Sequence, residues 1–570
     1  MSSHSFNRSK PFPPCPAPSD RPLPFAIDEM DFSIWLKTLA NADDMAKCQQ
    51  ILQVLQTLNN AYPPGRDLIP GRTRLFFLEK LGSVLTAVTA VLTLIPDITD
   101  EPTPVEDELP LSEISVWGNL ELGNAYSLLS QEDWFKDDEY YSIEEKTLIL
   151  SNGIQAMGRG LLYIFQTYTN PHAFFWHKCF QLYRFALQYR LTDSEFNPNA
   201  QLIDNAFKRV LVLALSNTKQ FSQHEMRTIY DLLGHYSFHA GLLKSVPKKK
   251  FRGIPSIHLK GYGQPAISHD DSDIHDPDLL YIATVTVASK ILEATYDKHA
   301  RHVPTDRLML LRLAKTLTLN EQRKDPREIA QRNHLGSMGF GNIVEFLRSK
   351  EIEKQNFLAE TGLFDPSRPG ELRDLDFEIV STEGKRADTE TSPNPGKSPN
   401  KTMPPPAFQI VEFTAQTEIW NTSNQDHHKT NMCLVDKSAK GYGLLWTDDL
   451  IKPKVANIIG IMHKNLIIGL IRWLAQSKET GMFMGVELLG GNATVVKVSN
   501  PGYPNIEVSA IFLPGGDAAK QFASLIFMNK GFRPSEFIFL NKNHKKVRYR
   551  MIKQLHLTSF INHVEVIRSY

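Results

Sequence analysis

The chain has 570 residues, of which 42% are hydrophobic and 22% charged, and its 63 basic and 63 acidic residues give a formal net charge of zero. A single hydrophobic core stops growing well below this length, so we expect about two to four domains of ordinary globular composition. The balanced charge argues against a protein that binds nucleic-acid polymers or membrane surfaces over its whole face.

The N-terminal stretch 1–25 contains seven prolines and lacks the apolar core of a signal peptide, so we predict a disordered tail. The most membrane-like stretch, 75–95, is interrupted by Glu79 and Lys80. A transmembrane helix needs about 20 predominantly apolar residues. We therefore interpret this stretch as a buried or amphipathic helix and expect no integral membrane segment.

The four cysteines are far apart in the sequence and form no C-x-x-C pair; they are Cys15, Cys48, Cys179 and Cys433. This spacing predicts neither a zinc site nor a disulfide framework. We expect reduced thiols and a cytoplasmic protein.

Residues 26–375 predict a helical region. Apolar side chains recur there at helical spacing, as at Ile203 and Phe207. Two capping boxes, Ser142–Glu145 and Ser222–Glu225, precede apolar runs and predict helix starts.

The helical spacing breaks at residues 244–277, where a basic run, glycines and prolines, and an acidic loop follow one another. This break suggests a boundary within the helical region. Helical spacing resumes from Asp278 to about Lys354, and Pro277 followed by Asp278 suits the first turn of a helix.

The acidic loop His269–Asp276 is the best metal candidate, because its imidazoles and carboxylates are possible ligands of a divalent ion. It lacks the glycine and the distal glutamate of an EF-hand, and the chain has no H-E-x-x-H motif. A solvated loop is the favoured interpretation. A metal-dependent enzyme centred on this loop is the weaker alternative.

The familiar catalytic motifs are absent, since the chain has neither a G-x-S-x-G elbow nor a P-loop. Gly336–Gly341 has its glycines in the wrong order for a dinucleotide fingerprint and predicts a flexible turn. Gly515–Asp517 is not followed by the Glu-Phe of a diguanylate cyclase signature. We therefore predict that the protein is not an enzyme and has no cofactor.

Residues 382–406 contain six prolines and almost no large apolar residues, which predicts a flexible linker. Residues 407–500 then predict an antiparallel barrel or sandwich, and residues 501–570 a β extension. The expected strands are Phe408–Phe413, Asn431–Val435, Tyr442–Trp446, Val455–Met462, Ile467–Trp473, Met482–Leu489 and Thr494–Val498.

One run in this β region carries specific chemistry: Asp436-Lys437-Ser438-Ala439-Lys440-Gly441, which lies between two expected strands. A short Asp and Ser in a turn present acceptors and a hydroxyl, and Gly441 permits a positive φ or a close approach. The run resembles the (Asp/Asn)-x-Ser-x-x-Gly signature of PilZ domains, which bind cyclic di-GMP. The resemblance implies that Asp436 and Ser438 contact a guanine and that Gly441 shapes the turn.

PilZ receptors also carry an Arg-x-x-x-Arg run just before the first strand, whose guanidinium groups bind guanine and phosphate. No arginine occurs between Arg386 and Arg472. Lys429 supplies a point charge there, without the planar fork of arginine. The predicted ligand-binding residues are Asp436, Ser438, Gly441, Lys429 and Arg472.

Lys546, Arg548 and Arg550 alternate with apolar residues, which places three cations on one face of a strand. A solvated face that protects a sheet edge is the favoured interpretation. An anion-binding face is the alternative.

Further runs in the helical region, Leu182–Ala186 and Phe207–Arg209, resemble large proteobacterial proteins with a helical N-terminal region and a PilZ-like C-terminal barrel. The predicted fold is therefore multidomain, with an all-α N-terminal region and a C-terminal all-β PilZ-like antiparallel barrel. The first functional hypothesis is a non-enzymatic cyclic di-GMP effector or adaptor that engages a protein partner through its helical region. The second is an interaction scaffold whose barrel has lost the nucleotide.

Overall fold

A computed structural model describes the chain over most of its length. The residues described are 22–61, 69–92, 108–245, 254–267, 276–296, 307–318, 326–360, 430–448, 451–462, 466–477, 481–500, 503–515, 522–528, 537–542, 545–558 and 560–569. The predicted tail and linker therefore lie almost entirely outside the described residues.

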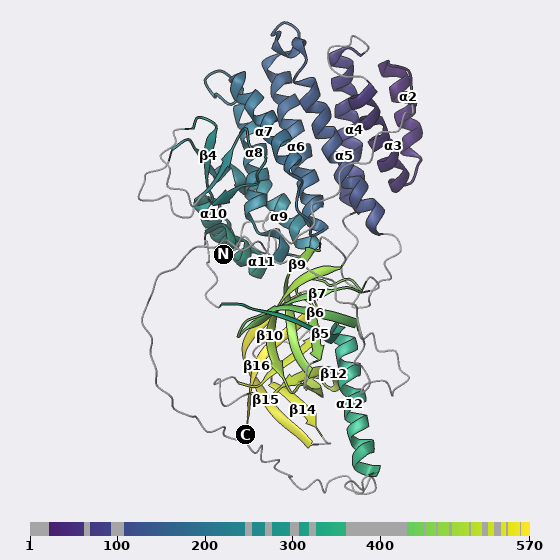
Figure 1. The fold of residues 1–570 in the computed structure, drawn as a ribbon, viewed down its shortest axis with the longest axis vertical. Helices are drawn as coiled ribbons and strands as arrows, with labels where there is room; N and C mark the ends of the chain where they lie inside the picture. Colours follow the sequence, from purple (N-terminus) through teal and green to yellow (C-terminus); the bar gives the residue numbers. More distant parts are fainter. Residues whose placement is uncertain are drawn as a thin grey trace, which may run out of the picture. The chain divides into compact units, whose positions relative to one another are not determined.

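The first part of the chain is a stack of helices, drawn in purple and blue in Figure 1. They are α2 (Glu29–Ala40), α3 (Asp44–Ala61), α4 (Gly71–Leu92), α5 (Glu108–Leu129), α6 (Ile143–Gln166), α7 (Ala173–Gln188), α8 (Ala200–Leu215) and α9 (Gln223–Tyr236), with the short 3-10 helices η1 (Asp133–Lys136), η2 (Thr218–Gln220) and η3 (Ser237–His239). The all-α prediction is confirmed for this part.

Both predicted capping boxes are present. The Ser142 hydroxyl accepts from the Glu145 amide and the Glu145 carboxylate accepts from the Ser142 amide, at the start of α6. Ser222 and Glu225 make the same reciprocal pair at the start of α9. Each box satisfies amides that the first helical turn leaves without intrahelical acceptors.

Helix α6 lies at the centre of this stack and is buried along most of its length. At Gly123 of α5, a Cβ atom would lie 2.9 Å from Cγ of Met157 of α6, so the glycine lets the two helices approach closely. Aromatic side chains fill part of the core of this stack, where the buried Tyr183 and Phe207 rings stack with centroids 3.9 Å apart. In the described part, no helix combines the length and hydropathy needed to cross a bilayer.

A small sheet interrupts the region predicted to be helical. Its strands are β1 (Gly241–Leu243), β2 (Pro255–His258), β3 (Ala266–Ile267) and β4 (Leu279–Ala283), in the order β1-β4-β2-β3. The prediction of a helix from Asp278 is wrong. Burial alternates along β4 with a period of two, and the Asp276 carboxylate accepts from the Asp278 amide in a turn, so the chain enters a strand.

Helices resume only after this sheet. They are α10 (Val285–Tyr296), α11 (Arg307–Thr318) and α12 (Phe340–Glu360). Gly339, with a φ of +89°, makes the turn that starts α12. The turn predicted over Gly336–Gly341 is thus confined to Gly339, since Gly336 lies in β5 and Gly341 in α12. The part of α12 after Leu347 belongs to a separate unit, Arg348–His427, most of which lies outside the described residues.

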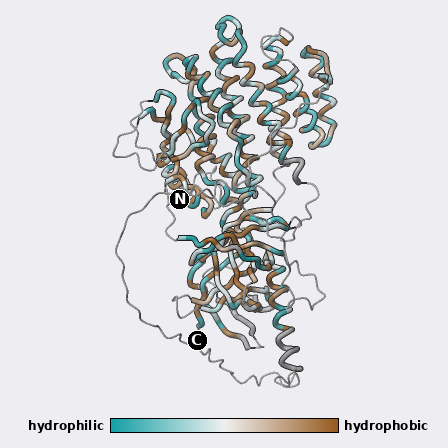
Figure 2. The backbone as a smooth tube through the Cα atoms, viewed as in Figure 1, coloured by the Kyte–Doolittle hydropathy of each residue, from teal (hydrophilic) through white to brown (hydrophobic). Residues whose placement is uncertain are grey.

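The first barrel is closed, antiparallel and ordered β10-β7-β6-β5-β8-β9. Its strands are β5 (Glu328–Met338), β6 (Thr430–Lys437), β7 (Gly441–Trp446), β8 (Ile458–Met462), β9 (Leu466–Gln476) and β10 (Met482–Gly491). All but β5 fall close to predicted strands. In Figure 2 the barrel strands are mainly coloured as hydrophobic, as expected of strands that enclose a core.

Strand β5 is the main departure from the sequence-based prediction, because it lies inside the region expected to be helical. Asn333 pairs with Cys433 of β6, and Leu335 pairs with Met462 of β8. Figure 1 draws β5 in teal among green strands, because residues 339–429 separate it from β6 in the sequence. The predicted strand Phe408–Phe413 lies outside the described residues.

The predicted β extension 501–570 forms a second closed barrel, ordered β11-β12-β13-β16-β15-β14. This barrel also includes Thr494–Asn500, which the sequence assigned to the first barrel. Its strands are β11 (Thr494–Asn500), β12 (Tyr503–Leu513), β13 (Ser524–Met528), β14 (Phe537–Lys542), β15 (Lys545–Leu557) and β16 (Ile561–Arg568). An apolar cluster joins the two barrels and the start of α12; its buried members include Phe340, Ile343, Leu466, Ile468, Leu489, Ile511, Leu513, Ile526 and Phe560.

Candidate ligand-binding site

The turn between β6 and β7 is fixed by Ser438. Its amide and its hydroxyl both donate to the Gly441 carbonyl, at 2.8 and 3.1 Å. A Cβ atom at Gly441 would lie 2.6 Å from the Val486 carbonyl oxygen of β10. A glycine is needed at residue 441 because the backbone of β10 approaches it closely, and not because its φ is positive.

The carboxylate of Asp436 lies at the end of β6, over Gly443 of β7. A side chain at residue 443 would overlap this carboxylate, so the glycine makes room for it. Arg327 Nη1 donates to Asp436 Oδ1 in an ion pair whose two side chains are only 25% and 23% exposed. Partial burial strengthens such a pair and fixes the orientation of the guanidinium.

Arg327 comes directly before the first strand of the barrel, and Arg323 precedes it by four residues. The run Arg323-x-x-x-Arg327 therefore has the form and the position of the arginine motif described above. The prediction that this motif is missing is wrong. Residues 339–429 are inserted after the first strand, so the arginine run lies far before the Asp436–Gly441 turn in the sequence. Arg323 itself lies outside the described residues.

This arginine pair could have been found from the sequence. The string Arg-Lys-Asp-Pro-Arg stands at residues 323–327, and the next eleven residues form β5. A proline between the arginines also disfavours helix at this point. The predicted helix from Asp278 to about Lys354 covers this stretch, so neither the arginine run nor strand β5 is expected there.

Arg472 lies near the turn but on a different strand. In the pairing of β9 with β10, Gly485 faces Trp473 and Val486 faces Ile471, so Arg472 is the extra residue of a β-bulge. Bulges commonly redirect a side chain beside a binding site. Its Nε lies 3.3 Å from Glu487 Oε2, and Glu487 faces Gly441 across the β10–β7 ladder.

The structure gives less information about the other cations named in the sequence analysis. Lys429 lies outside the described residues. Arg548 and Arg550 are exposed on β15, and Lys546 has no described side chain. Their role as a solvated or an anion-binding face stays a prediction.

Of the predicted metal loop His269–Asp276, Asp276 alone is described, and its carboxylate belongs to a group of three possible ligands that the prediction did not name. The ligand atoms of His258, Asp276 and Asp278 lie within 4.8 Å of one another, whereas His269–His275 lie outside the described residues. Asp276 already pairs with His258 at 2.7 Å, and the Lys260 ammonium lies 2.5 Å from Asp278. A cation there would have to displace this ammonium.

The thiols in the described part are unpaired, and Cys48 and Cys179 are buried. Burial raises the pKa of Cys48 to about 11 and that of Cys179 to about 12. Such thiols remain protonated near neutral pH and are poor nucleophiles. Cys15 lies outside the described residues.

Comparison with protein families matches residues 303–494 to the middle PilZ domain of the cyclic-di-GMP receptor FimW. The chain contains a PilZ domain. Residues 31–247 match the N-terminal domain of the same receptor, so the two matched ranges take in more than half of the chain. Neither the curated proteins nor the solved structures gave a significant match.

The PilZ domain begins before α11 and therefore includes Arg323, Arg327 and β5. This corrects the prediction of a C-terminal PilZ-like barrel starting at residue 407. The second barrel follows the matched range, so the PilZ domain occupies the middle of the chain. The insertion after β5 contains the proline-rich stretch 382–406, which has the composition of a linker between domains, and this is why the sequence predicts a domain boundary there.

Proposed function

We propose that this protein is a non-enzymatic cyclic di-GMP effector, whose PilZ domain senses the nucleotide and whose helical region passes the signal to a protein partner. The observation that carries the proposal is the ion pair between Arg327 and Asp436. It brings the arginine run and the Asp-x-Ser-x-x-Gly turn, the two halves of the PilZ signature, to one place.

The chemistry of this pair suits a guanine nucleotide. The planar fork of Arg327 matches the O6 and N7 acceptors of guanine or two phosphate oxygens. Asp436 only accepts hydrogen bonds, which complements the N–H donors of the guanine edge. In the same turn, the Ser438 hydroxyl offers one more polar group. Arg472 and Lys429 are proposed to add positive charge around the dianionic ligand.

The experiment that tests this proposal is calorimetric titration of cyclic di-GMP into the full chain, with Arg327→Ala, Asp436→Ala and Ser438→Ala variants. We expect saturable binding by the parent protein and at least about a tenfold loss with Arg327→Ala or Asp436→Ala, equivalent to about 1.4 kcal/mol. Lys497→Ala, which removes an exposed cation from the second barrel, is the matched control and should bind like the parent.

Two outcomes would contradict the proposal. One is no binding heat from the folded parent protein at about 100 μM ligand, a concentration that detects dissociation constants of that order. The other is equal affinity in the parent and the Arg327→Ala variant. Either result would favour the alternative of a barrel that serves only as an interaction scaffold.

Helix α11 suggests how the signal reaches the helical region, because it directly precedes the arginine run. Arg312 of α11 donates to the Gln220 carbonyl at 3.0 Å, pairs with Glu225, and lies over the Phe221 ring. Thr316 accepts from the Gln220 side chain at 2.8 Å. These contacts tie α11 to η2 and to the first turn of α9. Ligand binding at Arg327 is therefore proposed to act on α9 through α11.

A second contact joins the barrel to the same part of the helical region. The Gln476 amide, at the end of β9, donates to the Tyr168 carbonyl at 3.0 Å, just after α6. The Tyr168 hydroxyl in turn donates to the Phe221 carbonyl. Two elements of the PilZ domain thus converge near Phe221. A cytoplasmic location is part of the proposal and is supported by the unpaired buried thiols.

A further inference from the structure

A cavity of about 470 Å³ opens on the helical region, far in sequence from the PilZ domain. It lies between α4 and α6, over α5, and its lining is about equally polar and apolar. The lining residues are Glu79, Gly82, Ser83, Thr86, Ala87, Leu122, Tyr126, Asn152, Gln155 and Arg159. The small residues of α4 leave the space that larger side chains would fill.

The lining follows two helices at helical spacing, so the cavity is a groove rather than a compact hole. Along α4 it extends from Glu79 to Ala87, and along α6 from Asn152 to Arg159. At 1.5 Å per residue these rows are about 10 to 12 Å long. That length accommodates about three to four residues of extended chain.

Arg159 is the charged group at the α6 side of the groove. Its Nε donates to the Asn119 side-chain oxygen at 3.0 Å, and Asn119 is fully buried. This contact fixes the guanidinium. Within the described residues Arg159 forms no ion pair, with Glu79 or with any other carboxylate, so its remaining N–H groups are available to a ligand.

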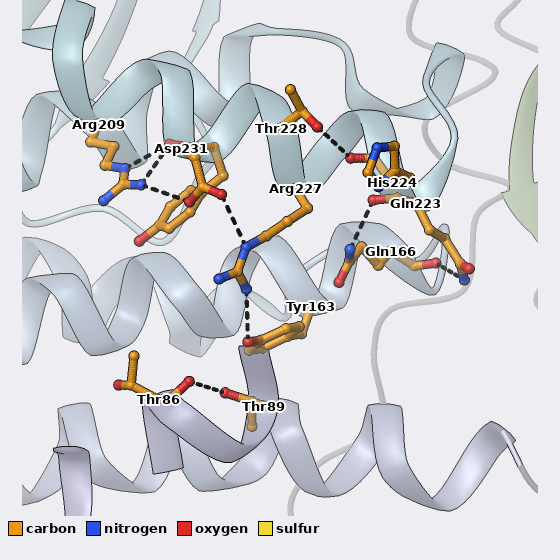
Figure 3. Close-up of polar contacts among 11 residues, drawn as sticks. Thr86, Thr89, Tyr163, Gln166, Arg209, Gln223, His224, Arg227, Thr228 and Asp231 are labelled. Carbon is orange, nitrogen blue, oxygen red and sulfur yellow. Dashed lines mark hydrogen bonds and ion pairs between the residues drawn. The ribbon is translucent and has the colours of Figure 1, made fainter. Parts of the chain in front are cut away.

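Two further arginines lie beside Arg159 and share a single carboxylate. Asp231 of α9 lies 3.3 Å from Arg227 and 3.7 Å from Arg209. Figure 3 shows Arg227 reaching from Asp231 to the Tyr163 hydroxyl, one helical turn beyond Arg159 on α6. Among the described residues the three guanidiniums are near two carboxylates, Asp231 and the groove residue Glu79, which leaves a local excess of positive charge.

The other polar groups suit a peptide backbone. Asn152 and Gln155 each carry both a donor and an acceptor, as a peptide group does, and the Asn152 side chain also hydrogen-bonds to Tyr126. Burial and the nearby Glu79 raise the pKa of Tyr126, so its hydroxyl stays neutral. Glu79 is exposed on α4 and lines the same groove as Arg159.

We propose that this groove binds an extended acidic segment of a partner protein, with a carboxylate on Arg159 and the peptide backbone along Asn152 and Gln155. Charge complementarity selects the acidic segment, since Arg159 and its arginine neighbours outnumber the carboxylates around them. The inference deepens the proposed function, because it names the surface through which the helical region engages its partner.

The test is selection of a random twelve-residue peptide display library on the immobilised full chain, without nucleotide. We expect the selected peptides to be enriched in Asp and Glu. The best peptide is then synthesised with a fluorophore, and its affinity is measured by anisotropy. Arg159→Glu should weaken binding at least about tenfold, because it replaces attraction by repulsion.

A second variant guards against misfolding of the first. Gln155→Glu keeps the shape of the side chain but adds a negative charge to the groove, and it should also weaken the acidic peptide. Lys37→Glu, at an exposed position of α2, makes the same charge change as Arg159→Glu and should bind like the parent.

Three results would overturn the inference: no enrichment above the bare support, enrichment of basic or neutral peptides, or equal binding by the parent, Arg159→Glu and Gln155→Glu. Because the library is screened without cyclic di-GMP, the result does not depend on nucleotide binding. Failure of the nucleotide titration and failure of the peptide selection can therefore be told apart.

Discussion

The position and the orientation of the Arg327 side chain have separate causes. The backbone holds it directly before β5, and the Asp436 carboxylate orients its guanidinium. In such a site the planar guanidinium of arginine can donate two parallel hydrogen bonds, whereas the ammonium of lysine acts as a point charge. We predict that Arg327→Lys, which keeps the charge, still weakens cyclic di-GMP binding by about tenfold, as measured by calorimetry. Parent-like affinity would mean that charge alone is used.

His563 should make stability depend on pH. It is 3% exposed, its Nε2 lies 2.9 Å from the Ser524 hydroxyl, and it stacks on His556. Burial, and then His556, lower the pKa of His563 to about 3. An unfolded histidine titrates near 6.5, so below that pH the unfolded chain takes up a proton that the folded chain refuses.

The resulting stabilisation is complete above about pH 6.5 and is lost as the pH falls toward 3, by up to about 1.4 kcal/mol per pH unit. We predict that the free energy of unfolding, measured with urea, falls less steeply between about pH 7 and pH 5 in His563→Gln than in the parent. Equal slopes would exclude His563 as the source.

A buried ion pair in the helical region gives a third prediction. Arg74 and Glu132 lie 3.0 Å apart, with side chains 5% and 7% exposed. Glu132→Gln removes the carboxylate charge that lies against the buried Arg74 guanidinium, and breaking a buried pair in this way costs about 3–5 kcal/mol. Asp133→Asn, which removes the exposed partner of Lys136, is the control and should leave the melting temperature unchanged. Similar melting temperatures for both variants would contradict this reasoning.

At the scale of elements, α11 is predicted to couple the arginine run to α9. Arg312→Met keeps the apolar stem over Phe221 but removes the bonds to Gln220 and Glu225. We expect cyclic di-GMP to protect α9 amides from hydrogen exchange in the parent, and this protection to be lost in the variant. Nucleotide affinity should change by less than about threefold, because coupling rather than contact is removed.

A Lys290→Met variant, on the exposed face of α10, is the control for this measurement. Unchanged protection of α9 in Arg312→Met would show that the signal does not pass through α11.

At the scale of the whole molecule, the two barrels depend on each other. Ile468 and Leu489 of the PilZ domain share a buried apolar cluster with Ile511 and Ile526 of the second barrel. A chain that ends after residue 493 would expose this apolar surface to water. We predict that it binds a hydrophobic dye and self-associates, as seen by scattering, while the full chain does not. A monomeric truncated chain would show that the PilZ barrel is self-sufficient.

Short sequence patterns determine many of the helix starts, turns and strands of this protein. Helix starts at Ser142 and Ser222 follow from capping chemistry within four residues, and the Ser438 turn follows from one short run. Strands β6 to β11 fall close to expected positions because short apolar runs between turn residues predict strands. Each of these features depends on neighbours in the sequence, which is why the sequence alone predicts them.

Features that bring together residues far apart in the sequence are visible only in the tertiary structure. Strand β5 pairs with β6 across residues 339–429, and its sequence carries no local sign of that partner. That pairing alone brings Arg327 to Asp436 and places the PilZ domain in the middle of the chain. The groove at Arg159 likewise exists only because α4, α5 and α6 pack with small residues between them. Sequence patterns report local preference, whereas strand partners and grooves depend on which distant surfaces exclude water together.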